Sequence, residues 1–131
     1  DNDVSEETAL ILYNLGSLYI SQKDYENAEK HLSLSFLQYK ELSAEEKTHK
    51  DNMALAAYNL SIAFTNQKKY QEALHYILIS FNEYNELIED GIMQHMEMYK
   101  LAAKQACYAY CNCKHPIKAM KFYYDALAKV R

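Results

Sequence analysis

The residues best suited to chemistry lie together near the C-terminus. Cys107, Cys111, Cys113 and His115 form the pattern C-x3-C-x-C-x-H. Zinc prefers thiolate and imidazole ligands, and two cysteines four residues apart share one face of a helix. His115 could return from a following turn to complete a set of four ligands. The C-x-C spacing is tighter than that of common structural zinc sites, and a buried thiol can also serve as a small apolar filler. We therefore predict no metal and no cofactor, and keep these four residues as the only metal candidates.

Nothing else in the sequence is typical of catalysis. The other histidines are scattered along expected helices, without a nucleophile and a carboxylate in a recognisable order; they are His31, His49, His75 and His95. With two glycines in the whole chain, a glycine-rich phosphate loop cannot form. We predict that the protein is not an enzyme.

Composition favours one all-helical domain. The chain has 131 residues, half of them apolar, but only two Gly and one Pro. An all-β fold needs turn residues far more often. No apolar run approaches the ~18–20 residues of a membrane span. Three cysteines make an odd number, which favours a reducing, cytoplasmic location over a disulfide framework. The chain begins with Asp rather than Met, as a segment of a longer protein would.

Charge is unevenly distributed along the chain. Residues 1–91 hold 7 basic and 16 acidic side chains, a net charge of −9, whereas residues 92–131 hold 7 basic and 2 acidic, a net charge of +5. This split is compatible with solvated helix faces, with head-to-tail stacking or with an acidic partner. The cations near the C-terminus are Lys114, Lys118, Lys121, Lys129 and Arg131. Nucleic acid would require more net charge and interleaved aromatic residues, so we do not expect it as a partner.

One 20-residue pattern occurs three times. YNLGSLYISQKDYENAEKHL starts at Tyr13, YNLSIAFTNQKKYQEALHYI at Tyr58, and a fainter copy, KQACYAYCNCKHPIKAMKFY, at Lys104. Three small residues align these copies at spacings of 45 and 46 residues: Ala28, Ala73 and Ala119. A fixed period of this size is typical of stacked helical repeats, which act through a surface shaped by stacking.

We expect six helices in three hairpins, over residues 5–22 and 25–42, about 44–67 and 71–90, and 92–112 followed by a helix from Pro116. Asp3 and Ser5 are candidate N-caps of the first helix. Ser43 and Glu46 have capping-box spacing, which predicts one continuous helix from about 44 to 67. Gly91 stands where a helix end favours a left-handed residue.

Each hairpin pairs two small residues where its helices should approach closely. These pairs are Gly16 with Ala28, Ser61 with Ala73, and Cys107 with Ala119. A bulky replacement would overpack the hairpin at a cost of ~1–3 kcal/mol.

These residues resemble the tetratricopeptide repeat. The first copy matches through Leu12, Leu15-Gly16, Tyr19, Ala28, Leu32 and Ser35, and the second through Leu60-Ser61, Phe64, Ala73, Ile77 and Ser80. The third matches more weakly through Ala106-Cys107, Tyr110, Ala119, Tyr123 and Ala126. The family period is about 34 residues, so this chain resembles its long-helix variants. These include the repeats of kinesin light chain, of the polarity adaptor with Leu-Gly-Asn repeats and of bacterial peptide-sensing regulators, and the resemblance does not favour one of them. The resemblance implies an all-α solenoid of six antiparallel helices in a right-handed superhelix, forming one domain (1–131) with repeats 5–43, 44–91 and 92–131.

The resemblance also implies a concave groove lined by the first helix of each hairpin. The expected peptide-binding residues are Tyr13, Asn14, Ser17, Leu55, Tyr58, Asn59, Ile62, Asn66, Leu101, Lys104, Gln105 and Tyr108, with Leu10, Ile20, Ser21, Thr65, Cys111 and Asn112 on the same face. Asn14, Asn59 and Gln105 share one repeat position. Their carboxamides could hold a peptide backbone or, alternatively, bond helix to helix within the protein.

The sequence therefore predicts a protein–protein interaction module, an adaptor that binds a peptide or helical segment of a partner in this groove. The alternative is a structural scaffold segment that self-associates or forms part of a longer superhelix. The cationic clamp that binds a carboxylate terminus is absent from the matching positions, so a chaperone tail is not the expected ligand.

Overall fold

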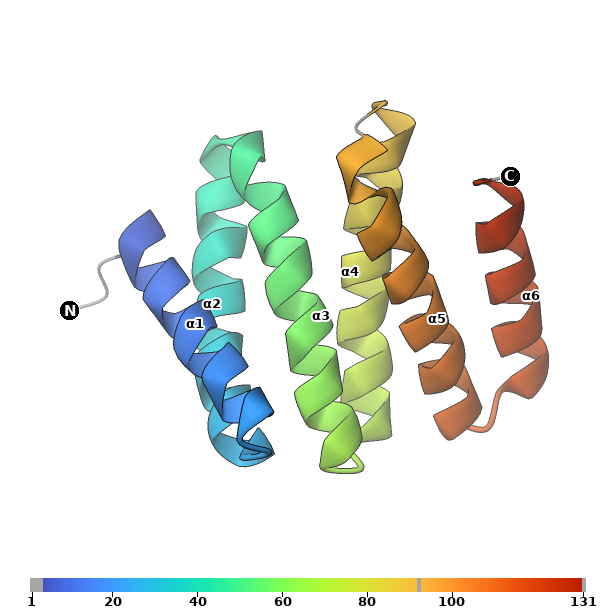
Figure 1. The fold of residues 1–131 in the computed structure, drawn as a ribbon, viewed down its shortest axis with the longest axis horizontal. Coiled ribbons are helices and arrows are strands. Elements are labelled where there is room, and N and C mark those ends of the chain that lie inside the picture. The colour runs from blue at the N-terminus through green and yellow to red at the C-terminus, as the bar shows by residue number, and fades with distance from the viewer. Residues whose placement is uncertain (1–3, 92, 131) are drawn as a thin grey trace.

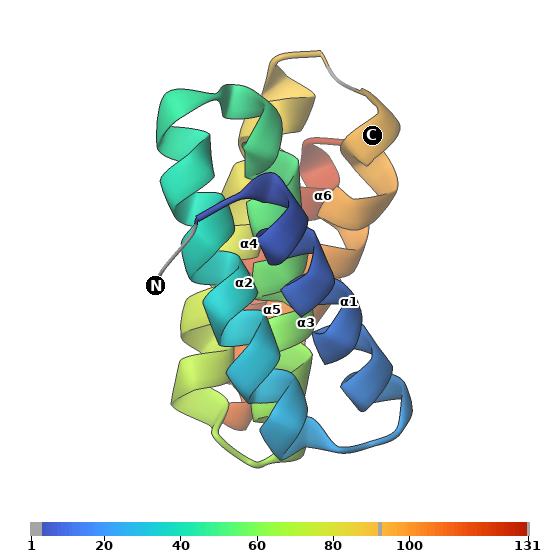
Figure 2. The same ribbon diagram turned by 90° about the vertical axis from the view of Figure 1, so that its left-hand side faces the viewer.

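The structure is a layer of three helical hairpins. The computed structural model describes residues 4–91 and 93–130, and within those ranges it contains helices and turns but no strands. The helices are α1 (Glu6–Ser21), α2 (Tyr25–Glu45), α3 (Lys50–Asn66), α4 (Tyr70–Glu89), α5 (Met96–Asn112) and α6 (Pro116–Ala128), with short 3-10 helices η1 (Lys47–His49) and η2 (Met93–His95). Each helix packs mainly against the next one in the chain. Helices α1, α3 and α5 lie on one side of the layer, with α2 and α4 behind them (Figures 1 and 2). The predicted all-α solenoid is confirmed.

The three hairpin turns have the same backbone geometry. Each places a lysine in the left-handed region, Lys23 at φ 60°, Lys68 at φ 62° and Lys114 at φ 63°. The residue after each lysine donates its N–H to a carbonyl five residues earlier, at 2.9 Å in all three turns. Such a bond satisfies a carbonyl that the helix end would otherwise leave free. The repeat is therefore a repeat of conformation as well as of sequence.

The predicted helix ends are largely correct. The Ser5 hydroxyl accepts the Thr8 N–H at 3.1 Å and caps α1, whereas the other candidate, Asp3, lies outside the described residues. Pro116 is the first residue of α6, where its missing N–H costs nothing. Gly91 follows α4 with φ 83°, a conformation that glycine adopts without strain.

The continuous helix predicted from about 44 to 67 is wrong. Helix α2 continues to Glu45, and α3 begins at Lys50 after η1. Ser43 is buried inside α2, and its hydroxyl donates to the Lys40 carbonyl at 2.8 Å. It therefore bonds backward within its own helix and cannot cap a following one. The fifth helix likewise begins later than expected, at Met96 after η2; its expected first residue, Ile92, lies outside the described residues.

The two joints between hairpins share a histidine that the sequence analysis did not single out. His49 ends η1 and its ring lies 6.4 Å from that of Tyr39, and His95 ends η2 with its ring 6.0 Å from that of Tyr84. Both histidines and both tyrosines recur at the repeat spacing. A repeated tyrosine–histidine pair therefore fills each joint where a single long helix was expected.

The two helices of the first hairpin approach each other closely at Gly16. A Cβ atom at this position would lie 2.4 Å from Cγ and 2.6 Å from Cδ2 of Leu32, which is itself fully buried. The alanines that the sequence predicts at the close approach of the three hairpins, Ala28, Ala73 and Ala119, are all buried. The predicted close approach at Gly16 is thus present, but the atoms nearest to a Cβ there belong to Leu32 rather than to Ala28, and a side chain larger than hydrogen would have to displace Leu32.

Replacing Gly16 by alanine tests this contact. In a helix interior this change alone would stabilise the protein by about 0.5–1 kcal/mol, but displacing the buried Leu32 should cost ~1–3 kcal/mol. We expect Gly16→Ala to lower the free energy of unfolding by about 1 kcal/mol or more in urea denaturation. Asn14→Ala, on the exposed side of the same helix, is the control and should have little effect. A Gly16→Ala protein as stable as the native one would show that Leu32 has room to move.

Candidate binding surfaces

A row of three leucines crosses the α1–α3–α5 face. Leu10, Leu55 and Leu101 occupy the same repeat position on α1, α3 and α5. Leu10 is 48% exposed and Leu101 43%, while Leu55 between them is half-buried. Tyr108, two turns after Leu101, is also exposed. Because equivalent residues stand side by side in stacked repeats, the face offers an apolar strip that runs across the three helices.

Three carboxamide side chains, each one helical turn after a leucine of the row, differ in their surroundings. Asn14 is exposed and Gln105 is half-buried. Asn59 donates from Nδ2 to the Tyr13 hydroxyl at 2.7 Å and so bonds α3 to α1. This is the internal role that the sequence left open as an alternative. The bond uses one of the amide's two N–H groups, so the carbonyl and the other N–H remain free to bind.

The remaining predicted groove residues vary in exposure. Tyr58 packs against the core between α4 and α5, and burial raises the pKa of its hydroxyl. Ser17 and Ile62 are half-buried, whereas Lys104 is exposed. Asn66 is exposed and donates to the Ile62 carbonyl of its own helix at 2.9 Å. The structure thus brings the leucine row and the carboxamides together on one face and directs Tyr58 toward the core.

Cys113 takes part in a joint that is repeated along the chain. The Gln67 amide, at the end of α3, donates to the carbonyl of Tyr25, the first residue of α2, at 3.2 Å. Forty-six residues later, the Cys113 thiol donates to the carbonyl of Tyr70, the first residue of α4, at 3.4 Å. Cysteine therefore replaces glutamine in the same inter-repeat bond.

The other metal candidates do not converge on Cys113. Cys107 is half-buried, and its pKa is raised by burial first and by the neighbouring Cys111 second. Cys111 and His115 are exposed. Across residues 4–91 and 93–130, no group of three or more cysteine, histidine or acidic side chains is arranged to hold a metal ion. Nor is any helix in this part of the chain long and apolar enough to cross a membrane.

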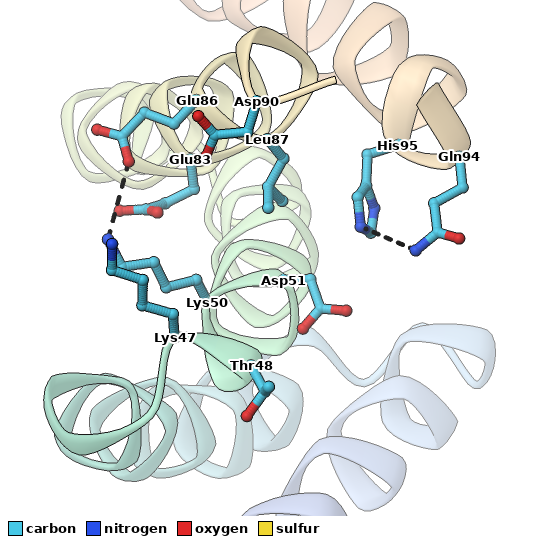
Figure 3. A pocket seen from close by; sticks show the side chains of 10 residues that line it. All are labelled: Lys47, Thr48, Lys50, Asp51, Glu83, Glu86, Leu87, Asp90, Gln94 and His95. Atoms are coloured by element: carbon cyan, nitrogen blue, oxygen red, sulfur yellow. Dashed lines mark hydrogen bonds and ion pairs between the residues drawn. The ribbon is translucent and has the colours of Figure 1, made fainter. Parts of the chain in front are cut away.

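A charged cavity of about 430 Å³ opens between the two joints (Figure 3). Four segments line it: η1, the first turn of α3, the end of α4, and η2. The lining residues are Lys47, Thr48, Lys50, Asp51, Glu83, Glu86, Leu87, Asp90, Gln94 and His95. Lys50 lies 3.8 Å from a Glu86 carboxylate oxygen. One oxygen of Glu83 is buried without a hydrogen-bond partner among the described residues, and burial raises the pKa of this carboxyl against the opposing effect of Lys50.

Sequence reasoning missed this cavity because it predicted one continuous helix through the break between α2 and α3. The signal that could have revealed it is the recurrence of a polar residue followed by histidine, Thr48-His49 and Gln94-His95, at the repeat spacing of 46. Four carboxylates against two lysines leave the cavity with an excess of negative charge.

Comparison with known proteins gives one family. The family model described as tetratricopeptide repeat matches residues 7–78, from α1 into α4 and more than half of the chain. Comparison with curated proteins found no match.

The bond between Tyr13 and Asn59 can be measured in the isolated protein. A part-buried hydrogen bond of this kind should contribute ~0.5–1.5 kcal/mol. We expect Tyr13→Phe and Asn59→Ala to be non-additive in urea denaturation, with a coupling energy in that range. Tyr13→Phe combined with Asn14→Ala is the matched control and should be additive. Zero coupling in the first pair would mean that the Asn59 amide is not committed to Tyr13.

Thiol reactivity should follow the different positions of the cysteines. Exposed Cys111 should react first with iodoacetamide, since burial raises the pKa of the Cys107 and Cys113 thiols and only the thiolate reacts. Alkylation of Cys107 and Cys113 should accelerate as the pH rises above the ordinary cysteine range. Peptide mapping by mass spectrometry over time gives the order, and labelling of Cys113 ahead of Cys111 would contradict the geometry.

Proposed function

Because the chain belongs to the tetratricopeptide repeat family, whose repeats generally mediate protein–protein interactions or scaffolding, we propose that it binds a segment of a partner protein across the α1–α3–α5 face. The proposed ligand is a peptide or helix, and no reaction is part of this role. We propose residues 1–131 as one domain of three repeats. Three free, unpaired cysteines support a reducing, cytoplasmic setting for it.

The exposed leucine row is the observation that supports this proposal best. Leu10 and Leu101 are about half exposed although they are equivalent residues of the first and last repeats. Full burial of a leucine is worth about 1.5–3 kcal/mol. Covering the exposed half of each leucine would therefore stabilise a complex by ~1 kcal/mol per leucine. Apolar side chains at regular spacing along a partner segment would match such a row.

Polar groups beside the row can orient the segment. The side chains of Asn14 and Gln105 make no hydrogen bond to another described residue, and Asn59 keeps a carbonyl and one N–H free beyond its bond to Tyr13. Carboxamides both donate and accept, so they can bond a main chain whatever its side chains. The leucines would then provide affinity, and the amides would fix the direction and register of the bound segment.

The test compares three forms of the protein in a binding experiment. Leu10→Ala/Leu101→Ala removes two leucines from the proposed site. Leu34→Ala/Leu37→Ala removes two comparably exposed leucines from α2, on the opposite side of the layer, and is the matched control. A partner captured by the native protein should bind the first variant about 10–30-fold more weakly, from ~2 kcal/mol of lost contact, and the control with unchanged affinity.

Circular dichroism melts establish that all three forms are equally folded. Equal binding by all three forms would remove the leucine row from the binding site. Loss of binding by the α2 control alone would move the site to the opposite side of the layer.

A further inference from the structure

Both ends of the layer carry an exposed apolar helix face. On α6 this tail face consists of Ile117, Met120 and Tyr124, all exposed, and half-buried Leu127; Ile117 is 83% exposed. On α1 the head face consists of Ile11, Leu15 and Leu18, with Ile11 59% exposed. In each helix the residues recur every three or four positions, so they form one continuous stripe.

The tail face repeats the surface that joins the second and third hairpins. Its residues Met120, Tyr124 and Leu127 stand 46 positions after Leu74, Leu78 and Phe81 of α4. Those three residues pack against the core cluster that contains Ala102 and Ala106 of α5. The tail face therefore has the position and the apolar character of a surface that already binds a first helix of the next repeat.

The head face is equivalent to the opposite surface of such a joint, the one that a first helix turns toward the hairpin before it. Ile11, Leu15 and Leu18 stand 45 positions before Ala56, Leu60 and Ala63 of α3, which are all fully buried. Ala56 packs with Phe36 of α2, and Leu60 and Ala63 with Ala28 and Leu32. One molecule thus exposes, at opposite ends, the two surfaces that bind each other within it.

From this pairing we propose that a second copy of the chain docks head to tail, with the α1 head face of one molecule on the α6 tail face of another. The contact repeats the joints of α2 with α3 and of α4 with α5. Because its two surfaces are different, it is a heterologous contact that leaves a free head and a free tail and can continue along a row of copies. This goes beyond the binding of a partner on the α1–α3–α5 face.

A polar contact of the internal joints also has its counterpart at the two ends. Gln67, after α3, donates to the carbonyl of the first residue of α2, and Cys113, after α5, donates to that of the first residue of α4. Gln22 stands at the equivalent position after α1 and is exposed. Pro116 is the first residue of α6. In a head-to-tail pair, the Gln22 amide would donate to the Pro116 carbonyl of the neighbouring copy.

Charge favours the same orientation. In the antiparallel register that places Gln22 beside Pro116, exposed Glu6 and Glu7 at the start of α1 would lie toward the end of α6, where Lys129 is exposed. Over the whole chain the first 91 residues carry −9 and the last 40 carry +5. Opposite charges at the two ends accelerate a head-to-tail encounter and oppose head-to-head or tail-to-tail contacts.

Side-chain size sets the spacing of the proposed contact. Both end faces carry bulky side chains. At the internal joint between α4 and α5, by contrast, α5 contributes alanines. Helix axes pack at about 8–10 Å according to the side chains between them. We expect α6 and α1 of neighbouring copies at the wide end of this range.

Two single-face variants provide the test, with sedimentation velocity as the readout. Leu18→Asp places a charge on the head face and Tyr124→Asp on the tail face, both at exposed sites that folding does not require to be apolar. The native chain should gain average mass as its concentration rises from micromolar to millimolar, and less so at high salt. Each variant alone should remain a monomer. An equimolar mixture should form dimers and nothing larger, since only one intact head and one intact tail can meet.

Leu34→Asp, on the exposed side of α2, is the control and should associate like the native chain. A native chain that stays monomeric throughout would overturn the proposal. So would self-association of either single-face variant, which would indicate a symmetric contact, or a mixture that remains monomeric. None of these results depends on the leucine row, so the proposed binding function is tested separately.

Discussion

The close approach of two helices within each hairpin is the constraint on which the rest of the structure depends. At Gly16 there is no space for a single additional carbon beside Leu32, and the alanines at one repeat position of α2, α4 and α6 are all buried. This contact fixes how each first helix is rotated against its second helix. That rotation in turn decides which residues face the core, which face the next repeat and which remain exposed. The leucine row, the carboxamides and the two end faces are all results of it.

The repeat made most of the fold predictable from sequence. Helical periodicity, small residues and the turns at Lys23 and Lys68 each recur, so an error in one copy is checked by the others. The prediction failed at the joints, which lie between the recurring patterns. There Ser43 and Glu46 have the spacing of a capping box, but a serine can equally bond backward within a continuing helix. Local spacing does not distinguish these two outcomes, whereas the burial of Ser43 inside α2 does.

The candidate site was less predictable than the fold because side chains serve both folding and binding. The sequence places Asn14, Asn59 and Gln105 at one repeat position, but only the structure shows Asn59 bonded to Tyr13. Likewise, the cysteine pattern draws attention to metal chemistry, whereas Cys113 occupies the place that Gln67 holds one repeat earlier. Position within the repeat explains this cysteine better than its spacing from the other two.

Packing between consecutive helices has a mechanical consequence. Since each helix contacts mainly the next one, a pulling force applied to the two ends is carried through each joint in turn, with few contacts between non-consecutive helices, such as the bond of Asn59 to Tyr13, to share the load. Under tension the weakest joint should separate first and release its hairpin as extended chain, roughly 150 Å for 45 residues. Such a molecule would lengthen in steps of one hairpin, so that a rising force is limited at each step and the remaining repeats stay folded.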